Sequence, residues 1–144
     1  MKKQIAVILI SVMSHIAICA ERQMETNLDR AIEVAQKDNK LVFIKYGREK
    51  CGNCRHLDSL INKKDIRLLD SEFVLVDLNC DAPSNQKAFY KLYRNAFKDA
   101  KALPFVVIAS ADGSLINSFS GYIEEEDYNK FIRDAKNKSK KLNQ

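Results

Sequence analysis

Two cysteines of this chain, Cys51 and Cys54, are separated by two residues. Apolar residues return at helical spacing directly after Cys54, so we expect the pair to lie at the start of a helix. The unpaired N–H groups of a helix N-terminus stabilise a thiolate, and the thiolate is the form of cysteine that attacks a disulfide. The spacing therefore predicts a redox pair, in which Cys51 attacks a client disulfide and Cys54 resolves the mixed disulfide.

Other uses of the CxxC spacing explain this sequence less well. His56 and Cys80 could complete a zinc site, but a second CxxC or an HxxxH sequence is absent. Attachment of c-type haem requires His directly after the second cysteine, where this chain has Arg55. A disulfide across so small a ring adds little as a structural crosslink. We therefore expect no metal and no cofactor, and we interpret Cys80 as a core thiol, with a regulatory or intermolecular thiol as the alternative.

Hydrophobic periodicity predicts the elements that position the pair. The expected order is helix, strand, the helix that begins at the cysteines, strand, helix, two strands and helix. Apart from the cysteine helix, these elements cover 27–37, 41–44, 73–78, 86–97, 103–108, 115–119 and 127–136. A turn at 111–114 makes the last two strands antiparallel, whereas the earlier strand-helix-strand units require parallel pairing. We therefore predict an α/β domain with a mixed central sheet of about four strands flanked by helices, and with a helix before the first strand.

The first twenty residues have the layout of a signal peptide. Two lysines precede an uncharged apolar run, residues 5–18, which is too short for a comfortable membrane span. We expect cleavage after Ala20, with cleavage after Cys19 as an alternative. Acylation of Cys19, as in a lipoprotein, is disfavoured because residues 16–18 place a bulky Ile where a small residue is normal. Residues 21–144 would then form a periplasmic or secreted domain without stable membrane insertion, in a compartment that lets disulfides persist.

The composition limits the class of protein. With 144 residues, 46% of them apolar, the chain can build one globular domain with a hydrophobic core. Only four Gly and two Pro argue against an all-β fold with many tight turns. Loss of residues 1–20 lowers the formal net charge from +5 to +3, and many remaining lysines lie in a basic C-terminal tail. A solvated, fraying helix end explains that tail better than a nucleic-acid or membrane site, so we expect no nucleic-acid partner.

Four short segments resemble the thioredoxin superfamily. They are Leu41–Ile44, Cys51–Arg55, Leu103–Phe105 and Asp112–Gly113. The resemblance runs from about Asn27 to about Lys136 and is greatest to exported thioredoxin-like domains. It implies a thioredoxin-like fold in which Pro104 is a cis-proline that faces the cysteines and helps to hold a client strand. It also implies protein thiol or disulfide clients, and a redox partner protein that regenerates the dithiol.

Three residues depart from the thioredoxin pattern and are predicted to tune the redox pair. Lys50 stands where thioredoxins usually carry Trp, and a cation beside Cys51 favours the thiolate. Lys45 stands where thioredoxins carry a buried Asp, and Asp77 stands where they carry the Lys that pairs with it. We hypothesise that Lys45 and Asp77 form a charge-swapped version of that pair. The alternative is two unrelated surface residues.

The sequence thus predicts a thiol:disulfide oxidoreductase that acts on exported proteins by dithiol/disulfide exchange at Cys51 and Cys54. Gly52 and Asn53 lack the proline that thioredoxin has between its cysteines, and together with the basic surroundings this favours a protein more oxidising than thioredoxin. The alternative is a thioredoxin-fold binding or chaperone-like module whose CxxC is non-catalytic or binds a metal. The absence of Trp before the motif supports that alternative. Whether the enzyme would reduce, oxidise or isomerise disulfides stays open.

Overall fold

A computed structural model describes residues 22–142, so the predicted signal peptide, residues 1–20, lies outside the described residues. Eight helices and strands follow one another in the predicted order. They are α1 (Leu28–Asp38), β1 (Leu41–Gly47), α2 (Gly52–Asn62), β2 (Phe73–Asn79), α3 (Pro83–Phe97), β3 (Phe105–Ala109), β4 (Leu115–Ser120) and α4 (Glu125–Leu142). Within the described range, no helix is both long and apolar enough to cross a membrane.

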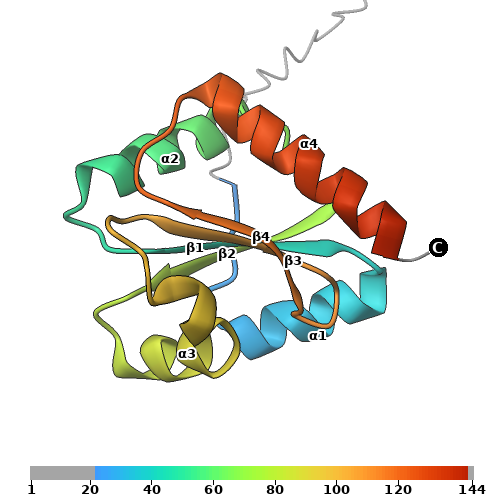
Figure 1. Cartoon of the computed structure of the whole chain (residues 1–144), viewed down its shortest axis with the longest axis horizontal. Helices are drawn as coiled ribbons and strands as arrows, with labels where there is room; N and C mark the ends of the chain where they lie inside the picture. The colour runs from blue at the N-terminus through green and yellow to red at the C-terminus, as the bar shows by residue number, and fades with distance from the viewer. Residues whose placement is uncertain (1–21, 143–144) are drawn as a thin grey trace, which may run out of the picture.

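The four strands form one sheet in the order β2-β1-β3-β4. Strand β1 pairs in parallel with β2 and antiparallel with β3, and β3 pairs antiparallel with β4. Figure 1 shows α1 and α3 against one face of the sheet and α2 and α4 against the other. The predicted α/β fold, with a mixed four-stranded sheet between helices and a helix before the first strand, is confirmed.

Strand β1 lies at the centre of this arrangement and supplies both hydrophobic cores. Val42, Ile44 and Tyr46 belong to the core under α1 and α3, whereas Phe43 belongs to the core under α2 and α4. This alternation follows from the two-residue period of a strand, and burial of both faces makes the run almost entirely apolar. Lys45 is the exception: it is a charged residue within this apolar run, and it is only 4% exposed.

An aromatic cluster fixes α3 against the end of β1 that leads to the cysteines. The ring of Phe89 stacks on Tyr46 with 4.0 Å between centroids, and it meets Phe97 and Phe105 edge-on at 5.7 and 6.0 Å. Such aromatic pairs stabilise the fold beyond the free energy gained by burying their surface area. Since Tyr46 directly precedes the last residue of β1, this packing holds the strand end from which the CxxC loop departs.

The ends of two helices differ from the sequence prediction. Helix α3 begins at Pro83, three residues before the predicted start at 86, because proline suits the first positions of a helix. Helix α4 runs to Leu142 instead of ending near residue 136. Its lysines are not all solvated, since Lys136 contacts Glu72 at 2.5 Å and Lys138 donates to the carbonyl oxygen of Ile116 at 2.7 Å. These long-range contacts anchor the helix beyond the apolar repeat that sequence periodicity detects.

Replacement of Phe89 by Ala is expected to lower the free energy of unfolding by about 3–5 kcal/mol, because the cluster loses its central ring and retains a cavity. The matched control is Leu92→Ala on the same helix, where the side chain is 42% exposed and the expected loss is below about 1 kcal/mol. Urea unfolding followed by circular dichroism measures both. Equal losses in the two variants would show that Phe89 does not organise this core.

Candidate active site

Cys51 is the N-cap residue of α2. Its backbone is extended, with φ −104° and ψ 119°, and its Sγ accepts a hydrogen bond from the backbone N–H of Cys54 at 3.2 Å. The first turn of α2 contains no acidic residue, so no carboxylate within that turn offsets the positive end of the helix dipole. The cysteine at this position is therefore placed to be stabilised as a thiolate once it is reduced.

The two cysteines form a disulfide, with Cα atoms 5.2 Å apart. Cys51 is partly exposed, whereas Cys54 is only 1% exposed. A Cβ atom at Gly47 would lie 2.8 Å from Sγ of Cys54, so position 47 leaves no room for a side chain. Sequence analysis did not single out Gly47, although a glycine that ends a strand before a reactive motif signals close approach. The difference in exposure fits an attacking Cys51 and a resolving Cys54.

The segment before β3 lies against the disulfide. The peptide bond between Leu103 and Pro104 is cis, as the resemblance implied, and Pro104 is buried. The carbonyl oxygen of Leu103 is 3.8 Å from Sγ of Cys51 and accepts a hydrogen bond from the Asn53 amide at 3.3 Å. The structure therefore brings Cys51, Cys54 and the Leu103–Pro104 segment together, while the role of Pro104 toward a client stays a prediction.

The ammonium group of Lys45 contacts two carboxylates. Asp77, which is opposite Lys45 in the β1–β2 register, lies 3.0 Å from Nζ, and Asp58 of α2 contacts the same nitrogen. The side chain of Lys45 is 5% exposed, and those of Asp58 and Asp77 are 32% and 37% exposed. The hypothesised contact between Lys45 and Asp77 is confirmed. Its influence on the redox pair stays a prediction.

Asp58 is the functional candidate that sequence analysis missed. It follows Cys54 by four residues on α2, and residues four apart share one face of a helix. The helix thus places a carboxylate one turn from the buried cysteine. The spacing could have pointed to Asp58, but an acidic residue on an amphipathic helix also fits a solvated position. Removal of Lys45 would leave two neighbouring carboxylates without their shared cation. The loss of one partner from such a cluster destabilises the fold, because the remaining charges are no longer compensated.

The basic residues before the motif differ in their surroundings. Nη2 of Arg48 lies 3.6 Å from Sγ of Cys80 and 3.2 Å from Asp81. The hydrogen bond to Cys80, and then the charges of Cys80 and Asp81, raise the pKa of Arg48. Lys50 is exposed and forms no ion pair with any residue from 22 to 142. Cys80 is 7% exposed within the core under α1 and α3, which confirms its interpretation as a core thiol.

The further zinc ligands considered from the sequence lie in different surroundings. The ring of His56 lies 4.9 Å from that of Tyr122, whereas Cys80 lies beside Arg48. In the part of the chain that the structure describes, no three His, Cys, Asp or Glu side chains gather as a metal site.

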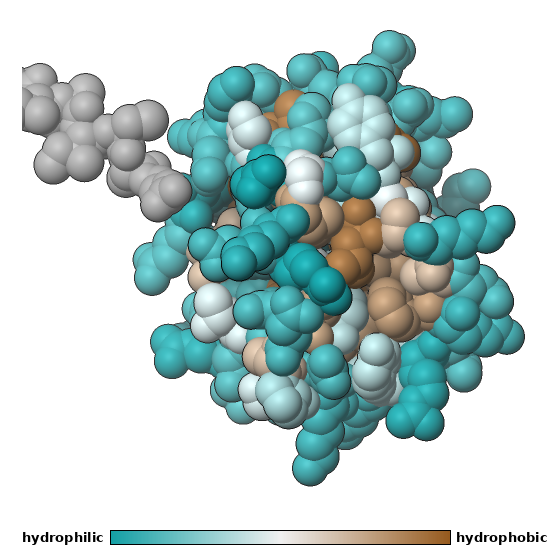
Figure 2. All heavy atoms as spheres, turned by 90° about the vertical axis from the view of Figure 1, so that its left-hand side faces the viewer, coloured by the Kyte–Doolittle hydropathy of each residue, from teal (hydrophilic) through white to brown (hydrophobic). Residues whose placement is uncertain are grey.

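The end of the molecule that carries the start of α2 faces the viewer in Figure 2. A hydrophobic area lies near the middle of this face, with hydrophilic side chains around it. Ala102 is exposed and Leu103 is partly exposed next to Cys51, so apolar surface adjoins the disulfide. Such a patch at a reactive site is typical of a surface that another protein contacts.

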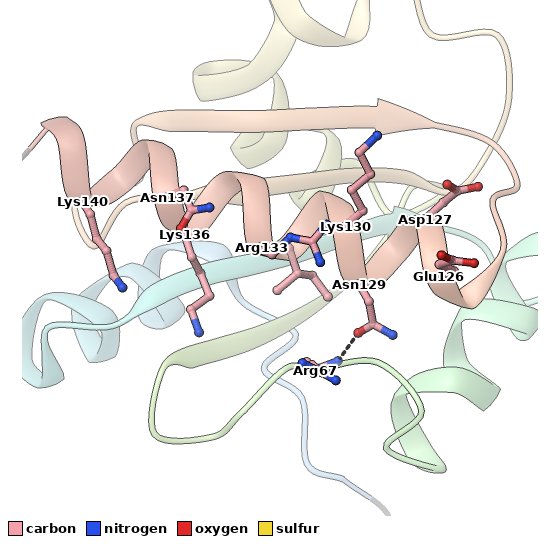
Figure 3. Close-up of a pocket in the computed structure, with 10 residues that line it drawn as sticks. Arg67, Glu126, Asp127, Asn129, Lys130, Arg133, Lys136, Asn137 and Lys140 are labelled. Atoms are coloured by element: carbon pink, nitrogen blue, oxygen red, sulfur yellow. Dashed lines mark hydrogen bonds between the residues drawn. The ribbon is translucent and has the colours of Figure 1, made fainter.

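A groove of about 650 Å³ lies along α4 and is lined mainly by charged and amide side chains. Figure 3 shows Glu126 and Asp127 near one end and Lys136 and Lys140 toward the other. Across the groove, the backbone N–H of Arg67 donates to the side chain of Asn129 at 2.8 Å. No cysteine lines this groove.

On the hypothesis that the Lys45 cluster takes up the proton of Cys54, replacement of Asp77 by Asn is expected to slow the resolving step by roughly tenfold, because the cluster loses one of its two carboxylates. The step is measured by stopped flow as the second release of thionitrobenzoate from a mixed disulfide on Cys51, across a range of pH. Asp99→Asn, at an exposed position without an ion pair in the described residues, is the control. An unchanged rate and pH profile in Asp77→Asn would mean that the charge-swapped pair of Lys45 and Asp77 has no role in the resolving step.

Solved structures share this fold. A disulphide isomerase from Xylella fastidiosa Temecula1 superimposes with a TM-score of 0.60 at 21% identity, covering 75% of this chain and 87% of its own. A protein from Bacteroides thetaiotaomicron, provisionally assigned as a disulphide-isomerase, gives 0.62 at 18% identity, covering 81% and 91%. A thioredoxin variant from Halobacterium salinarum NRC-1 gives 0.56 at 17% identity, covering 80% and 90%.

Sequence comparison gives two results. No curated protein matches the chain. The thioredoxin-like domain family matches residues 28–136, a range that begins at the first residue of α1 and ends within α4. That range covers the whole sheet, both cysteines and Pro104. The chain belongs to the thioredoxin-like domain family.

Proposed function

We propose that this protein is a thiol:disulfide oxidoreductase that acts on exported proteins by dithiol/disulfide exchange at Cys51 and Cys54. The observation that carries the proposal is the position of Cys51, a partly exposed sulfur at the N-terminus of α2 that is hydrogen-bonded to the Cys54 N–H. Membership of the thioredoxin-like domain family supports it, as do the names of two structural neighbours, one a disulphide isomerase and the other provisionally assigned as one.

The two cysteines can perform exchange without a cofactor. The Cys51 thiolate attacks one sulfur of a client disulfide, the client S–S bond breaks, and the other client sulfur leaves and takes up a proton. Cys54 then loses its proton and attacks Sγ of Cys51, which releases the second client thiol. Two electrons have passed to the client, and the protein holds the Cys51–Cys54 disulfide, as in this structure. A redox partner protein restores the dithiol, and the reverse sequence oxidises a client.

The surroundings of Cys51 support a protein as the client. The carbonyl oxygen of Leu103 next to Sγ can accept a hydrogen bond from a client backbone, although it is shared with the Asn53 amide. Apolar surface from Ala102 and Leu103 adjoins the sulfur. A binding or chaperone-like module is the second candidate, because Lys50 occupies the place where thioredoxins usually carry Trp.

Cys51→Ser is expected to abolish reduction of insulin disulfides in the presence of dithiothreitol, because the attacking thiolate is lost. Insulin precipitation followed by turbidity measures the rate. Cys80→Ala is the matched control and should retain the rate, since Cys80 lies in the core under α1 and α3, whereas Cys54 is on α2, which covers the other face of the sheet (Figure 1). Turnover that survives in Cys51→Ser would favour the binding module over the enzyme.

The reduction potential of the Cys51–Cys54 couple is expected to be less negative than about −270 mV, the value for thioredoxin. The physical reason is that Lys50 and Arg55 stabilise the thiolate of the reduced form. Equilibration in glutathione buffers, followed by mass spectrometry of alkylated thiols, measures it. Lys50→Ala should make the potential more negative, whereas Lys130→Ala, a cation remote from the motif, should not. A reduction potential equal to that of thioredoxin or more negative would contradict the claim that these cations stabilise the thiolate.

Export is proposed from residues 1–20 alone. Expressed in full in a bacterial host with a periplasm, the chain should be recovered from that compartment, and its intact mass should correspond to a chain that begins at Glu21. The variant Leu9→Arg, which places a charge in the apolar run, should keep the full mass and stay in the cytoplasm. A lipid-modified product that begins at Cys19, or a full-length chain in the wild type, contradicts cleavage after Ala20.

A further inference from the structure

The groove along α4 has two walls that the fold holds in place. One wall is the exposed side of α4, and the other is Arg67, in the segment between α2 and β2. Ile66 and Leu68 are buried in the core under α2 and α4, whereas Arg67 between them is exposed. The side chain of Asn129 joins the walls, because it accepts from the N–H of Arg67 at 2.8 Å and donates to the carbonyl oxygen of Asp65 at 3.3 Å. The groove is therefore already formed without a ligand.

Side chains of opposite charge lie at the two ends of the groove. Glu126 and Asp127 lie at the end where α4 begins, whereas Arg133 and Lys140 lie farther along the helix (Figure 3). Residues seven apart share one face of a helix, so Glu126, Arg133 and Lys140 form one row. Arg67 adds a positive charge on the opposite wall. The groove is thus negative at one end and positive along the rest.

These five charged groups are unpaired in the described range. All of them are exposed, and none forms an ion pair with any residue from 22 to 142. The other two cations of the groove differ from them. Lys136 is neutralised by Glu72 at 2.5 Å, and Figure 3 shows the side chain of Lys130 pointing away from Arg67. Three cations and two carboxylates are therefore available to a ligand.

The length of the charged row limits the kind of ligand. At about 1.5 Å per residue, the rise along α4 from Glu126 to Lys140 is about 21 Å. A free amino acid or another small zwitterion is much shorter than this row and cannot meet both ends at once. An extended polypeptide spans the same distance with about six or seven residues. The row therefore fits a segment of a protein better than a small molecule.

The acidic end of the groove argues against other elongated anions. A nucleic acid strand or an anionic membrane presents negative charge along its whole surface, so Glu126 and Asp127 would repel it. In the described part of the chain, no aromatic residue lines the groove, so unpaired bases would find no ring on which to stack. A polypeptide, by contrast, can carry opposite charges in the order that the groove presents.

We propose that the groove along α4 binds an extended segment of a partner protein, with basic residues toward Glu126 and Asp127 and acidic residues toward Arg133 and Lys140. Arg67 and Arg133 suit the acidic part, because a guanidinium group can donate two parallel hydrogen bonds to one carboxylate. Binding involves neither cysteine of the disulfide, so the inference goes beyond the proposed redox function and does not depend on it. The groove is a second surface for protein contact, in addition to the apolar area at the disulfide.

Fluorescence anisotropy with labelled, cysteine-free peptides tests the proposal on the full chain at low ionic strength. An ordered peptide carries lysines at one end and glutamates at the other, and a scrambled peptide alternates the same residues. The ordered peptide is expected to bind at least about fivefold more tightly than the scrambled one, because only its charges match both ends of the groove. Equal affinities, or no binding of the ordered peptide, overturn the proposal. Tighter binding of single-stranded DNA or of phosphatidylglycerol vesicles also overturns it, since the site would then recognise negative charge alone.

Variants of exposed residues test whether binding takes place in the groove. Arg133→Gln should weaken binding of the ordered peptide by about three- to fivefold. Arg94→Gln, at an exposed position on α3, is the matched control and should not change it. The double variant Glu126→Gln with Asp127→Asn should weaken binding of the ordered peptide but strengthen binding of a peptide of glutamates alone. Damage to the fold would weaken both peptides, and that result, or equal effects of Arg133→Gln and Arg94→Gln, contradicts binding in the groove.

Discussion

A hydrogen bond from the backbone N–H of Cys54 to Sγ of Cys51 puts a sulfur at the N-cap of α2, a position that Ser, Thr, Asp or Asn usually fills with an oxygen. Helix start and reactive centre thus coincide. The N–H groups that donate to a capping atom at a helix start, together with the helix dipole, also stabilise a thiolate when the disulfide is reduced. The sheet, in turn, holds this helix start in place. Strand β1 ends at Gly47, which leaves room for Sγ of Cys54, and the Leu103–Pro104 segment lies against Cys51.

The charged cluster below the helix places a second constraint on the site. Lys45 interrupts an otherwise apolar strand, and the fold accommodates it because Asp77 lies opposite it in register and Asp58 reaches it from α2. A single buried cation is costly to desolvate, so its partners must be near. The cluster therefore joins β1, β2 and α2 one turn from Cys54. One set of residues thus links the packing of the sheet to the electrostatics around the redox pair.

The sequence predicts local features of the site well and long-range ones poorly. Apolar spacing after Cys54 located the helix start, and the resemblance at Leu103–Phe105 located the cis peptide bond. The Lys45–Asp77 pair was foreseen from the resemblance, which aligns the two residues with a buried pair of thioredoxins, and the parallel register of β1 and β2 places them opposite each other. Asp58 was missed because an acidic residue on a helix has the same local pattern whether it faces solvent or a buried lysine. The extension of α4 was missed for a related reason, since Lys136 and Lys138 are held by residues that are distant in the chain.

The central claim is that Cys51 attacks and Cys54 resolves. Trapping of mixed disulfides tests it most directly, by incubating Cys54→Ser and Cys51→Ser with an unfolded, disulfide-containing client and identifying the linked cysteine by mass spectrometry after alkylation. Cys54→Ser should accumulate a mixed disulfide at Cys51, because the attacking thiol is present and the resolving thiol is not. Cys51→Ser should accumulate none. A mixed disulfide that forms mainly at Cys54 or Cys80, or equally in both variants, would contradict the assignment.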